Sequence, residues 1–385
     1  MKIALVHDYI RELGGAERVF KVLSDMYPEA PIYTAFVDKN SLVYEWFKDR
    51  SIIESRLGKL LKIWKLYSPL RFLIPLVWGS FDLSEFDLVI TSTSWYITRG
   101  FKIGKKTKVI AYCHTPPRNL YGYQTSIKWH GLEWKGFAPA VIYANVVNHF
   151  LRVYDFRVAQ KPDRTKRKII GGVDFFVANS KNVAERIWKF YRRKSTVIYP
   201  PVDVETIIKA AEGVDKGDYF LIVSRLADTK GLEEAAKAAK DLKIKLKIVG
   251  KGLGFSDIER RLRELSGKYV EVLGQVNDEE LWVLYAEAKG FIALAKNEDF
   301  GMTPVEAMAA GTPVIAFNGG GFCESVVDGV TGILIDDTDE VTLAKAVKRF
   351  NRIKWDKKKL QAQARKFSKE KFIKETKNFV KSKIK

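Results

Sequence analysis

The stretch EDFGMTPVEAMAAGTPVIAFNGGGFCE, residues 298–324, carries the strongest structural signal in the chain. Gly301 lets the backbone approach a ligand without an intervening side chain. Pro304 suits the first turn of a helix, where its missing N–H costs nothing. The free amides of that turn and the positive end of the helix dipole form a site for an anion. Because Glu298 and Glu306 cannot hold the anion, we expect them to bind hydroxyl groups. The segment therefore predicts a site for a sugar attached to a phosphate.

This segment resembles the signature of the retaining GT-B glycosyltransferases of family four, in which two glutamates flank a Phe-Gly pair. The resemblance extends to GGFCE (320–324), which the run VVDGVTGILI follows, and to SRLADTKG (224–231) upstream. Gly-Gly-Ala-Glu at 14–17 also follows the first strand, as it does in the family's N-terminal domain. These motifs run from residue 14 to residue 324, so the resemblance covers nearly the whole chain. A narrower resemblance, to the mannosyltransferases of surface polysaccharide and lipid-linked oligosaccharide assembly, rests on residues 112–123 and 175–203.

Buried-strand patterns alternate with helical patterns in both halves of the chain, which predicts an α/β protein with two doubly wound, Rossmann-like domains. The strand patterns are 2–9, 88–94, 108–114 and 175–180 in the first half, and 219–226, 246–250, 269–274, 290–295, 312–317 and 332–336 in the second. Pro200-Pro201 interrupts the pattern and marks the linker.

We therefore expect an N-terminal domain over 1–198 and a C-terminal domain over 199–365. The resemblance implies that the first binds the acceptor and the second the nucleotide-sugar donor. The tail is strongly helical in pattern. The resemblance implies the GT-B arrangement, in which the two domains face an interdomain cleft and a C-terminal helix, here 366–385, completes the first domain.

Length and composition are those of a globular protein of two domains, with 385 residues, 46% hydrophobic and 29% charged. No stretch reaches the roughly 20 apolar residues that cross a bilayer, and the first residues are too few and too polar for a signal peptide. Two cysteines, Cys113 and Cys323, exclude a disulfide framework. These features favour the cytoplasm, with an oligomeric state that the sequence does not fix.

The chain is strongly basic, with a formal net charge of +20, which suits nucleic acid, anionic lipid or phosphorylated ligands. Part of this charge is local, because Arg56, Lys59, Lys62 and Lys65 recur every three residues among apolar ones. As a helix, the segment 56–78 either packs on its own domain or lies on the anionic, cytoplasmic face of a membrane. An ion-pair surface of the kind found in thermophiles would also explain part of the excess.

The C-terminal half supplies the residues expected to hold the donor. By resemblance, Arg225 and Lys230 bind its pyrophosphate, and Glu298 contacts the sugar near the reacting carbon. Glu306 is expected to accept hydrogen bonds from the ribose, and the backbone of residues 300–303 (Phe300, Gly301, Met302 and Thr303) lines the sugar and phosphate. The alternatives are a surface salt bridge for the two cations and, for Glu306, a capping box with Thr303.

The N-terminal half supplies the remaining expected contacts. His114 ends a strand, and in the related enzymes a histidine here contacts the donor sugar; a structural histidine is the alternative. Gly15 is expected at the donor phosphate, and Gly14 and Arg118 at the acceptor, although the two glycines could equally serve the turn between strand and helix. The predicted catalytic set is thus Glu298, His114, Arg225 and Lys230.

The resemblance implies transfer with retention of configuration and no identifiable protein nucleophile. The leaving diphosphate would be stabilised by Arg225, Lys230 and the helix amides, so we expect no metal and no cofactor beyond the nucleotide sugar as co-substrate. Asp337-Thr338-Asp339 spells the Asp-x-Asp of metal-dependent glycosyltransferases, but it follows a late strand and is interpreted as a loop. KGLG (251–254) is interpreted as a turn.

The leading prediction is transfer of a hexose, by resemblance mannose from GDP-mannose, to a surface glycan or a polyprenyl-linked oligosaccharide. A nucleotide-sugar epimerase of the same fold needs no acceptor site. The loop at 14–17 and the residues Trp64, Trp129 and Trp134 favour the presence of such a site. A basic nucleic-acid-binding protein would explain the net charge but not two glutamates beside an anion site, so no nucleic-acid partner is expected. A glycosidase also uses two carboxylates, but it needs no pair of cations for a pyrophosphate.

Overall fold

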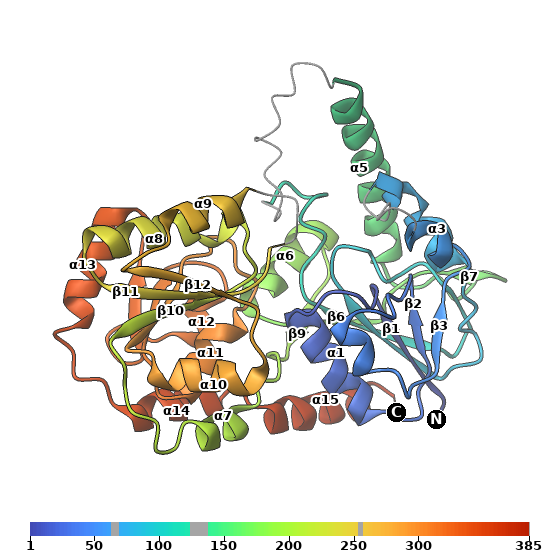
Figure 1. Cartoon of the computed structure of the whole chain (residues 1–385). Coiled ribbons are helices and arrows are strands. Elements are labelled where there is room, and N and C mark those ends of the chain that lie inside the picture. The colour runs from blue at the N-terminus through green and yellow to red at the C-terminus, as the bar shows by residue number, and fades with distance from the viewer. Residues whose placement is uncertain (63–68, 124–137, 253–256, 385) are drawn as a thin grey trace. The chain divides into compact units, whose positions relative to one another are not determined.

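The computed structural model describes residues 1–62, 69–123, 138–252 and 257–384 (Figure 1). For residues 138–141 it describes the backbone but not the side chains. The described residues form two compact units. The first unit holds the described residues up to Tyr199 and those from Ile373 onward, and the second runs from Pro200 to Phe372. The chain passes from one unit to the other next to the linker expected at Pro200-Pro201, while the cleft between the domains stays a prediction.

The first unit is built on a parallel seven-stranded sheet of order β3-β2-β1-β4-β6-β8-β9. Its four predicted strands are confirmed as β1 (Ile3–His7), β4 (Leu88–Thr93), β6 (Lys108–Cys113) and β8 (Phe175–Ala178). Three short strands add to them: β2 (Ile32–Thr34), β3 (Ile52–Glu54) and β9 (Ser195–Val197). An antiparallel pair lies apart from this sheet, β5 (Lys102–Ile103) with β7 (Ile169–Ile170).

The helices of the first unit follow from apolar residues spaced at three and four positions. Helix α1 buries Val19, Phe20 and Leu23. Ser180 caps the amino terminus of α6, because its side chain accepts from the amide of Val183. The described helices are α1 (Gly15–Met26), α2 (Leu42–Glu45), α3 (Gly58–Lys62), the 3₁₀ helix η2 (Pro69–Leu73), α4 (Ile74–Gly79), α5 (Ala138–Val158) and α6 (Lys181–Tyr191).

The second unit contains a parallel six-stranded sheet of order β12-β11-β10-β13-β14-β15, the order of a dinucleotide-binding fold. All six strands predicted in this half are confirmed: β10 (Tyr219–Val223), β11 (Lys245–Val249), β12 (Val270–Gly274), β13 (Gly290–Ala293), β14 (Val314–Phe317) and β15 (Gly332–Ile335). The strand order reverses between β10 and β13, so ligands of this fold class bind beside the carboxyl ends of those two strands.

Helices cover both faces of this second sheet (Figure 1). One face carries α8 (Leu232–Asp241), which follows the short 3₁₀ helix η4 (Asp228–Lys230), together with α9 (Ile258–Leu265) and α13 (Glu340–Phe350). The other carries α7 (Val204–Ala210), α10 (Asp278–Glu287), α11 (Met302–Ala309), α12 (Phe322–Ser325) and α14 (Lys357–Arg365).

The tail is helical as predicted, as α14 and then α15 (Lys369–Lys383). The amide of Val202 donates to Phe367 O at 3.1 Å, and that of Lys369 donates to Val202 O at 2.9 Å. The tail is therefore fastened to the start of the second unit before its residues from Ile373 onward join the first. Within the described residues, none of the helices is both long enough and apolar enough to cross a bilayer.

Candidate functional site

Polar side chains gather at the carboxyl ends of the central strands in each unit. In the second unit, Arg225 follows β10 and Glu298 follows β13, the two strands between which the order reverses. In the first unit, His7 ends β1 and Ser92 lies near the end of β4, again at the reversal. Each cluster thus occupies the position at which open α/β sheets bind their ligands.

The structure brings together two residues that the sequence places 68 positions apart. Lys230 Nζ lies 2.6 Å from Glu298 Oε2, and each side chain is 19% exposed. Gly231 makes this approach possible, because it has a φ of 68° and a Cβ there would lie 2.5 Å from Leu294 Cβ. Arg225 is exposed at the end of β10, on the same edge of the sheet.

The glycine of the Phe-Gly pair has a structural role that does not depend on a ligand. Gly301 is the residue before α11 and has a φ of 81°, and a Cβ would lie 2.4 Å from the Phe322 ring. The triple glycine of the next loop also allows two parts of the chain to approach closely, namely this loop and the backbone of Glu298. The amide of Gly321 donates to Glu298 O at 3.0 Å, and a Cβ on Gly320 would lie 2.3 Å from the same oxygen. The backbone of the glycine loop therefore contacts the backbone of Glu298, so that Glu298 is held at its main chain as well as its side chain.

Glu306 does not form the capping box that was the alternative explanation for it. Helix α11 begins at Met302 and its cap residue is Gly301, which has no side chain to offer. Instead, the Tyr285 hydroxyl on α10 donates to Glu306 Oε2 at 2.8 Å. Tyr285 is fully buried, so it holds the carboxylate of Glu306 in one orientation.

The other expected donor contacts differ in what their side chains do. Phe300 is buried and packs on Phe367 with ring centroids 5.3 Å apart, so only its backbone is available to a ligand. Met302 and Thr303 are half-buried residues of the first turn of α11. Their amides lie at the positive end of the helix, where an anion is favoured.

The first unit contains a buried polar chain that sequence reasoning found only in part. Ser92 Oγ lies 2.8 Å from His114 Nε2 and 3.1 Å from His7 Nδ1. On the other side of His7, Nε2 lies 3.6 Å from Glu17 Oε1. Burial, and secondarily the charge of His7, lower the pKa of His114 to about 3. His114 is therefore a neutral imidazole at physiological pH.

The signal for the missed residues was present in the sequence, because His7 ends a strand and Glu17 belongs to the Gly-Gly-Ala-Glu loop. Gly15 is the first residue of α1, and Gly14 before it has an extended φ of −151°, so no left-handed conformation requires glycine there. A Cβ at Gly14 would lie 2.9 Å from Glu17 Oε2. The glycine therefore leaves room for this carboxylate.

Arg118 lies in the loop after β6 and is half-buried, with its carbonyl accepting from the amides of Tyr121 and Tyr123. A second cation at this loop was missed. Arg186 of α6 is buried, donates to Thr115 Oγ1 at 3.1 Å, and stacks over the Tyr123 ring at 4.3 Å. Its place on a helix distant in sequence gave no signal.

The Asp-x-Asp sequence is a loop, as interpreted. Asp337 pairs with Lys296 at 3.0 Å, and Asp339 caps α13 by accepting from the amides of Val341 and Thr342. Throughout the described ranges, no group of three or more His, Cys, Asp and Glu residues could hold a metal ion. Several predictions fall outside the described residues: Lys65 and Trp64 within 56–78, Trp129 and Trp134, and the end of KGLG at 253–254.

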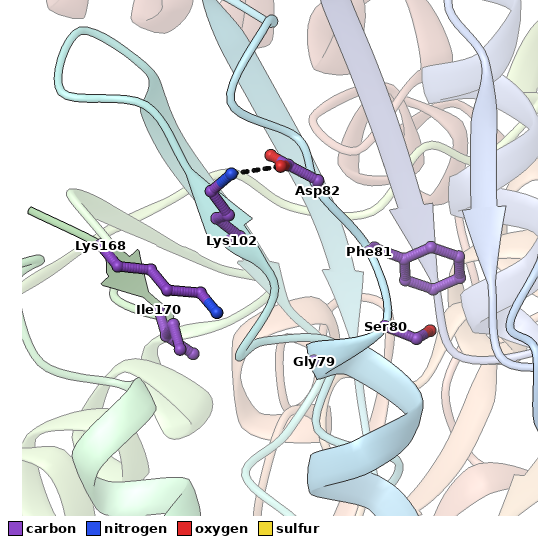
Figure 2. A pocket seen from close by; sticks show the side chains of 7 residues that line it. All are labelled: Gly79, Ser80, Phe81, Asp82, Lys102, Lys168 and Ile170. Atoms are coloured by element: carbon purple, nitrogen blue, oxygen red, sulfur yellow. Dashed lines mark hydrogen bonds and ion pairs between the residues drawn. The ribbon is translucent and has the colours of Figure 1, made fainter.

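A hollow of about 270 Å³ opens in the first unit near β5 and β7 (Figure 2). Lys102 is joined to Asp82 by an ion pair at this hollow. None of the predicted site residues lines it; its lining is Gly79, Ser80, Phe81, Asp82, Lys102, Lys168 and Ile170.

Comparison with known proteins supports the family that the sequence motifs resemble. Residues 13–206, just over half of the chain, match the family described as Glycosyltransferase Family 4, and residues 203–370 match Glycosyl transferases group 1. An uncharacterized glycosyltransferase of Methanocaldococcus jannaschii is 27% identical over 176 residues, which are 45% of this chain and 48% of that protein. The alpha-1,3/1,6-mannosyltransferase ALG2 of Homo sapiens is 25% identical over 299 residues, covering 70% of this chain and 65% of that protein.

These matches span from about half to two thirds of the length of those relatives. Among solved structures, Anabaena Alr3699/HepE in complex with UDP-glucose superposes with a TM-score of 0.66 at 19% identity, covering 99% of this chain and 100% of that one. At this identity the superposition establishes the fold, and the family match establishes descent. The chain belongs to glycosyltransferase family 4, and its fold is GT-B.

Proposed function

We propose that this protein is a retaining glycosyltransferase that moves a hexose, mannose from GDP-mannose, to a glycan or polyprenyl-linked oligosaccharide acceptor. The observation that carries the proposal is the cluster in the second unit, where Lys230 pairs with Glu298 beside the amino terminus of α11. Cations and helix amides suit a diphosphate, and carboxylates suit the hydroxyls of the sugar and ribose. The mannosyltransferase name of the human relative favours mannose.

In the proposed reaction, the bond between the anomeric carbon and the diphosphate oxygen breaks, and the oxygen of an acceptor hydroxyl bonds to that carbon on the same face. The departing phosphate oxygen takes the proton of that hydroxyl. Arg225, Lys230 and the amides of Met302 and Thr303 stabilise the negative charge that develops on the leaving diphosphate. Glu298 holds the sugar near the reacting carbon, and Glu306, fixed by Tyr285, accepts from the ribose hydroxyls. These cations take the place of a metal, so we expect turnover to persist in EDTA.

In the first unit, His114 is proposed to contact the donor sugar as a neutral hydrogen-bonding group. Its Nε2 is engaged with Ser92, so Nδ1 is the atom that would serve the sugar. Gly15 is proposed at the donor phosphate, and Gly14 and Arg118 at the acceptor.

The test is to incubate the purified chain with a panel of nucleotide sugars, GDP-mannose and UDP-glucose among them, with and without a polyprenyl-linked acceptor. Release of nucleoside diphosphate that depends on the acceptor, with an axial product linkage by NMR from an axial donor, is the expected result. Conversion of the nucleotide sugar without acceptor would show an epimerase instead. Salt-sensitive binding to duplex DNA without any transfer would show a nucleic-acid-binding protein.

Glu298→Ala should abolish transfer while leaving the circular dichroism spectrum unchanged. Glu264→Ala is the matched control, because Glu264 is an exposed carboxylate of the same unit that also pairs with a cation, Arg260. Turnover above a tenth of wild type in Glu298→Ala would contradict the role assigned to this residue.

A further inference from the structure

Helix α5 has apolar side chains on two opposite faces. Its inner face carries Val147, Leu151 and Val158, which are buried in the core of the first unit. A surface helix normally presents polar residues on the other side. Here the outward face recurs at intervals of three and four with exposed apolar residues, namely Ile142, Val146, Phe150, Val153 and Phe156. Figure 1 shows α5 as the long green helix.

The apolar face extends onto a neighbouring segment of the same unit. The Phe72 ring of η2 packs edge-on against Tyr143 of α5 with centroids 6.5 Å apart, and Arg71 Nε donates to Asn148 Oδ1 at 3.2 Å. Phe72 and, one turn further along in α4, Leu76 are both exposed. We call these residues the apolar face: Phe72, Leu76, Ile142, Tyr143, Val146, Phe150, Val153 and Phe156. A contiguous exposed surface of this kind marks an interaction site.

The rotation of α5 about its axis is fixed, so the apolar face cannot turn inward. Asp155 on the inner side is fully buried and forms an ion pair with Arg99. The same carboxylate accepts from the hydroxyls of Tyr191 at 2.7 Å and Tyr121 at 2.9 Å. Breaking a buried, hydrogen-bonded pair of this kind costs several kcal/mol, so the helix keeps its outward face exposed to its surroundings.

The charges around the apolar face identify what it contacts. Helices η2, α4 and α5, which carry the apolar face, have three cations, Arg71, Arg152 and Arg157, and their single acid is the buried Asp155. Helix α3 adds Lys59 and Lys62, of which Lys62 pairs with Glu54 of β3 at 2.9 Å. An apolar helix face flanked by Lys and Arg is the pattern of a helix that lies in the headgroup region of an anionic membrane. A second copy of this chain would bring like charges together, which disfavours a dimer at this surface.

From these observations we propose that the apolar face docks the protein on the surface of a membrane that contains anionic lipids. Helix α5 lies along the membrane surface, since none of the described helices could span the bilayer. The segment 56–78 that the sequence singled out contributes its described residues Phe72 and Leu76, while the larger part of the surface comes from α5. The proposal does not depend on which sugar is transferred.

The experiment is vesicle flotation of the full chain with phosphatidylcholine alone and with added phosphatidylglycerol. The test variant is Ile142→Ser/Phe150→Ser, at positions 62% and 67% exposed. The matched control is Val341→Ser/Trp188→Ser, where helical apolar side chains elsewhere are 63% and 51% exposed. Neither variant alters net charge, so the general attraction of a basic protein to anionic vesicles is the same in all three.

We expect wild type and control to bind anionic vesicles equally and the test variant to lose at least about tenfold in partition coefficient, with unchanged thermal midpoints. Equal binding by all three proteins would overturn the proposal, as would the absence of wild-type binding at low salt. Light scattering measures the oligomeric state of the same proteins. A wild-type dimer that the test variant converts to monomer, without any vesicle binding, would assign the face to self-association and also overturn the proposal.

Discussion

Lowering the pH tests the burial of His114 directly. The residue is 7% exposed, and burial first, then the charge of His7, lower its pKa to about 3. In the unfolded chain a histidine titrates near about 6.5. Between these two values the unfolded state binds a proton that the folded state does not, so stability falls as the pH falls through this window.

The size of the effect follows from the same two values. At pH 5 the folded imidazole stays neutral while nearly all of the unfolded imidazole is protonated. The loss of unfolding free energy relative to neutral pH is therefore about 2 kcal/mol from this residue alone. A folded pKa higher by one unit would leave that figure almost unchanged, because the folded imidazole would still be mainly neutral at pH 5.

Two measurements check this expectation. Histidine-selective NMR should show the His114 ring unprotonated down to about pH 4. The second measurement is the unfolding free energy of the first unit, obtained with urea at pH 7 and at pH 5. Its decrease from pH 7 to pH 5 should be smaller by about 2 kcal/mol in His114→Gln than in wild type. His149→Gln, which removes an exposed imidazole on α5, is the control and should keep the wild-type drop. A His114 ring that titrates near pH 6, or a His114→Gln variant with the full pH dependence, would refute the reasoning.

Two further substitutions test the second unit. Arg225→Ala should raise the dissociation constant of the nucleotide-sugar donor about 10- to 150-fold, because one charge-assisted bond is lost. The control is Arg260→Ala, which removes an exposed cation of α9 and should leave the dissociation constant unchanged. Equal dissociation constants for the two variants in calorimetry would contradict the pyrophosphate assignment. Gly301→Ala should lower the unfolding free energy by about 2–4 kcal/mol, from the positive φ and the contact with Phe322 together. Gly213→Ala, with a φ of 74° and open space around it, should cost only about 1 kcal/mol, and an equal cost for both would show that the contact contributes nothing.

The central strands of both sheets were predictable because parallel strands covered on both faces appear as continuous apolar runs. The three missed strands of the seven-stranded sheet are each three residues long, and the missed strands β5 and β7 have only two residues each. Strands β3 and β9 lie at the sheet edges and are only partly buried, so their sequences carry no such run. Length and position in the sheet thus decide which strands the sequence predicts.

Candidate site residues were predictable where they follow a strand, because the carboxyl ends of parallel strands share one edge. Their partners were not. The pairing of Lys230 with Glu298 depends on β10 lying beside β13, and no spacing in the sequence gives that order. The hydrogen bond from Tyr285 to Glu306 likewise depends on how α10 packs on α11. The local spacing of Thr303 and Glu306 suggested a capping box as the alternative, but the helix begins earlier, after Gly301.

The two restraints on Glu298 explain how a diphosphate would change this cluster. The backbone carbonyl of Glu298 accepts from Gly321, so the main chain stays in place whatever the side chain does. The carboxylate forms an ion pair with Lys230, 2.6 Å away. A diphosphate carries more negative charge than one carboxylate and therefore competes for Lys230. Binding of the donor phosphates would thus weaken the pair between Lys230 and Glu298, which couples recognition of the sugar to recognition of the phosphates that carry it.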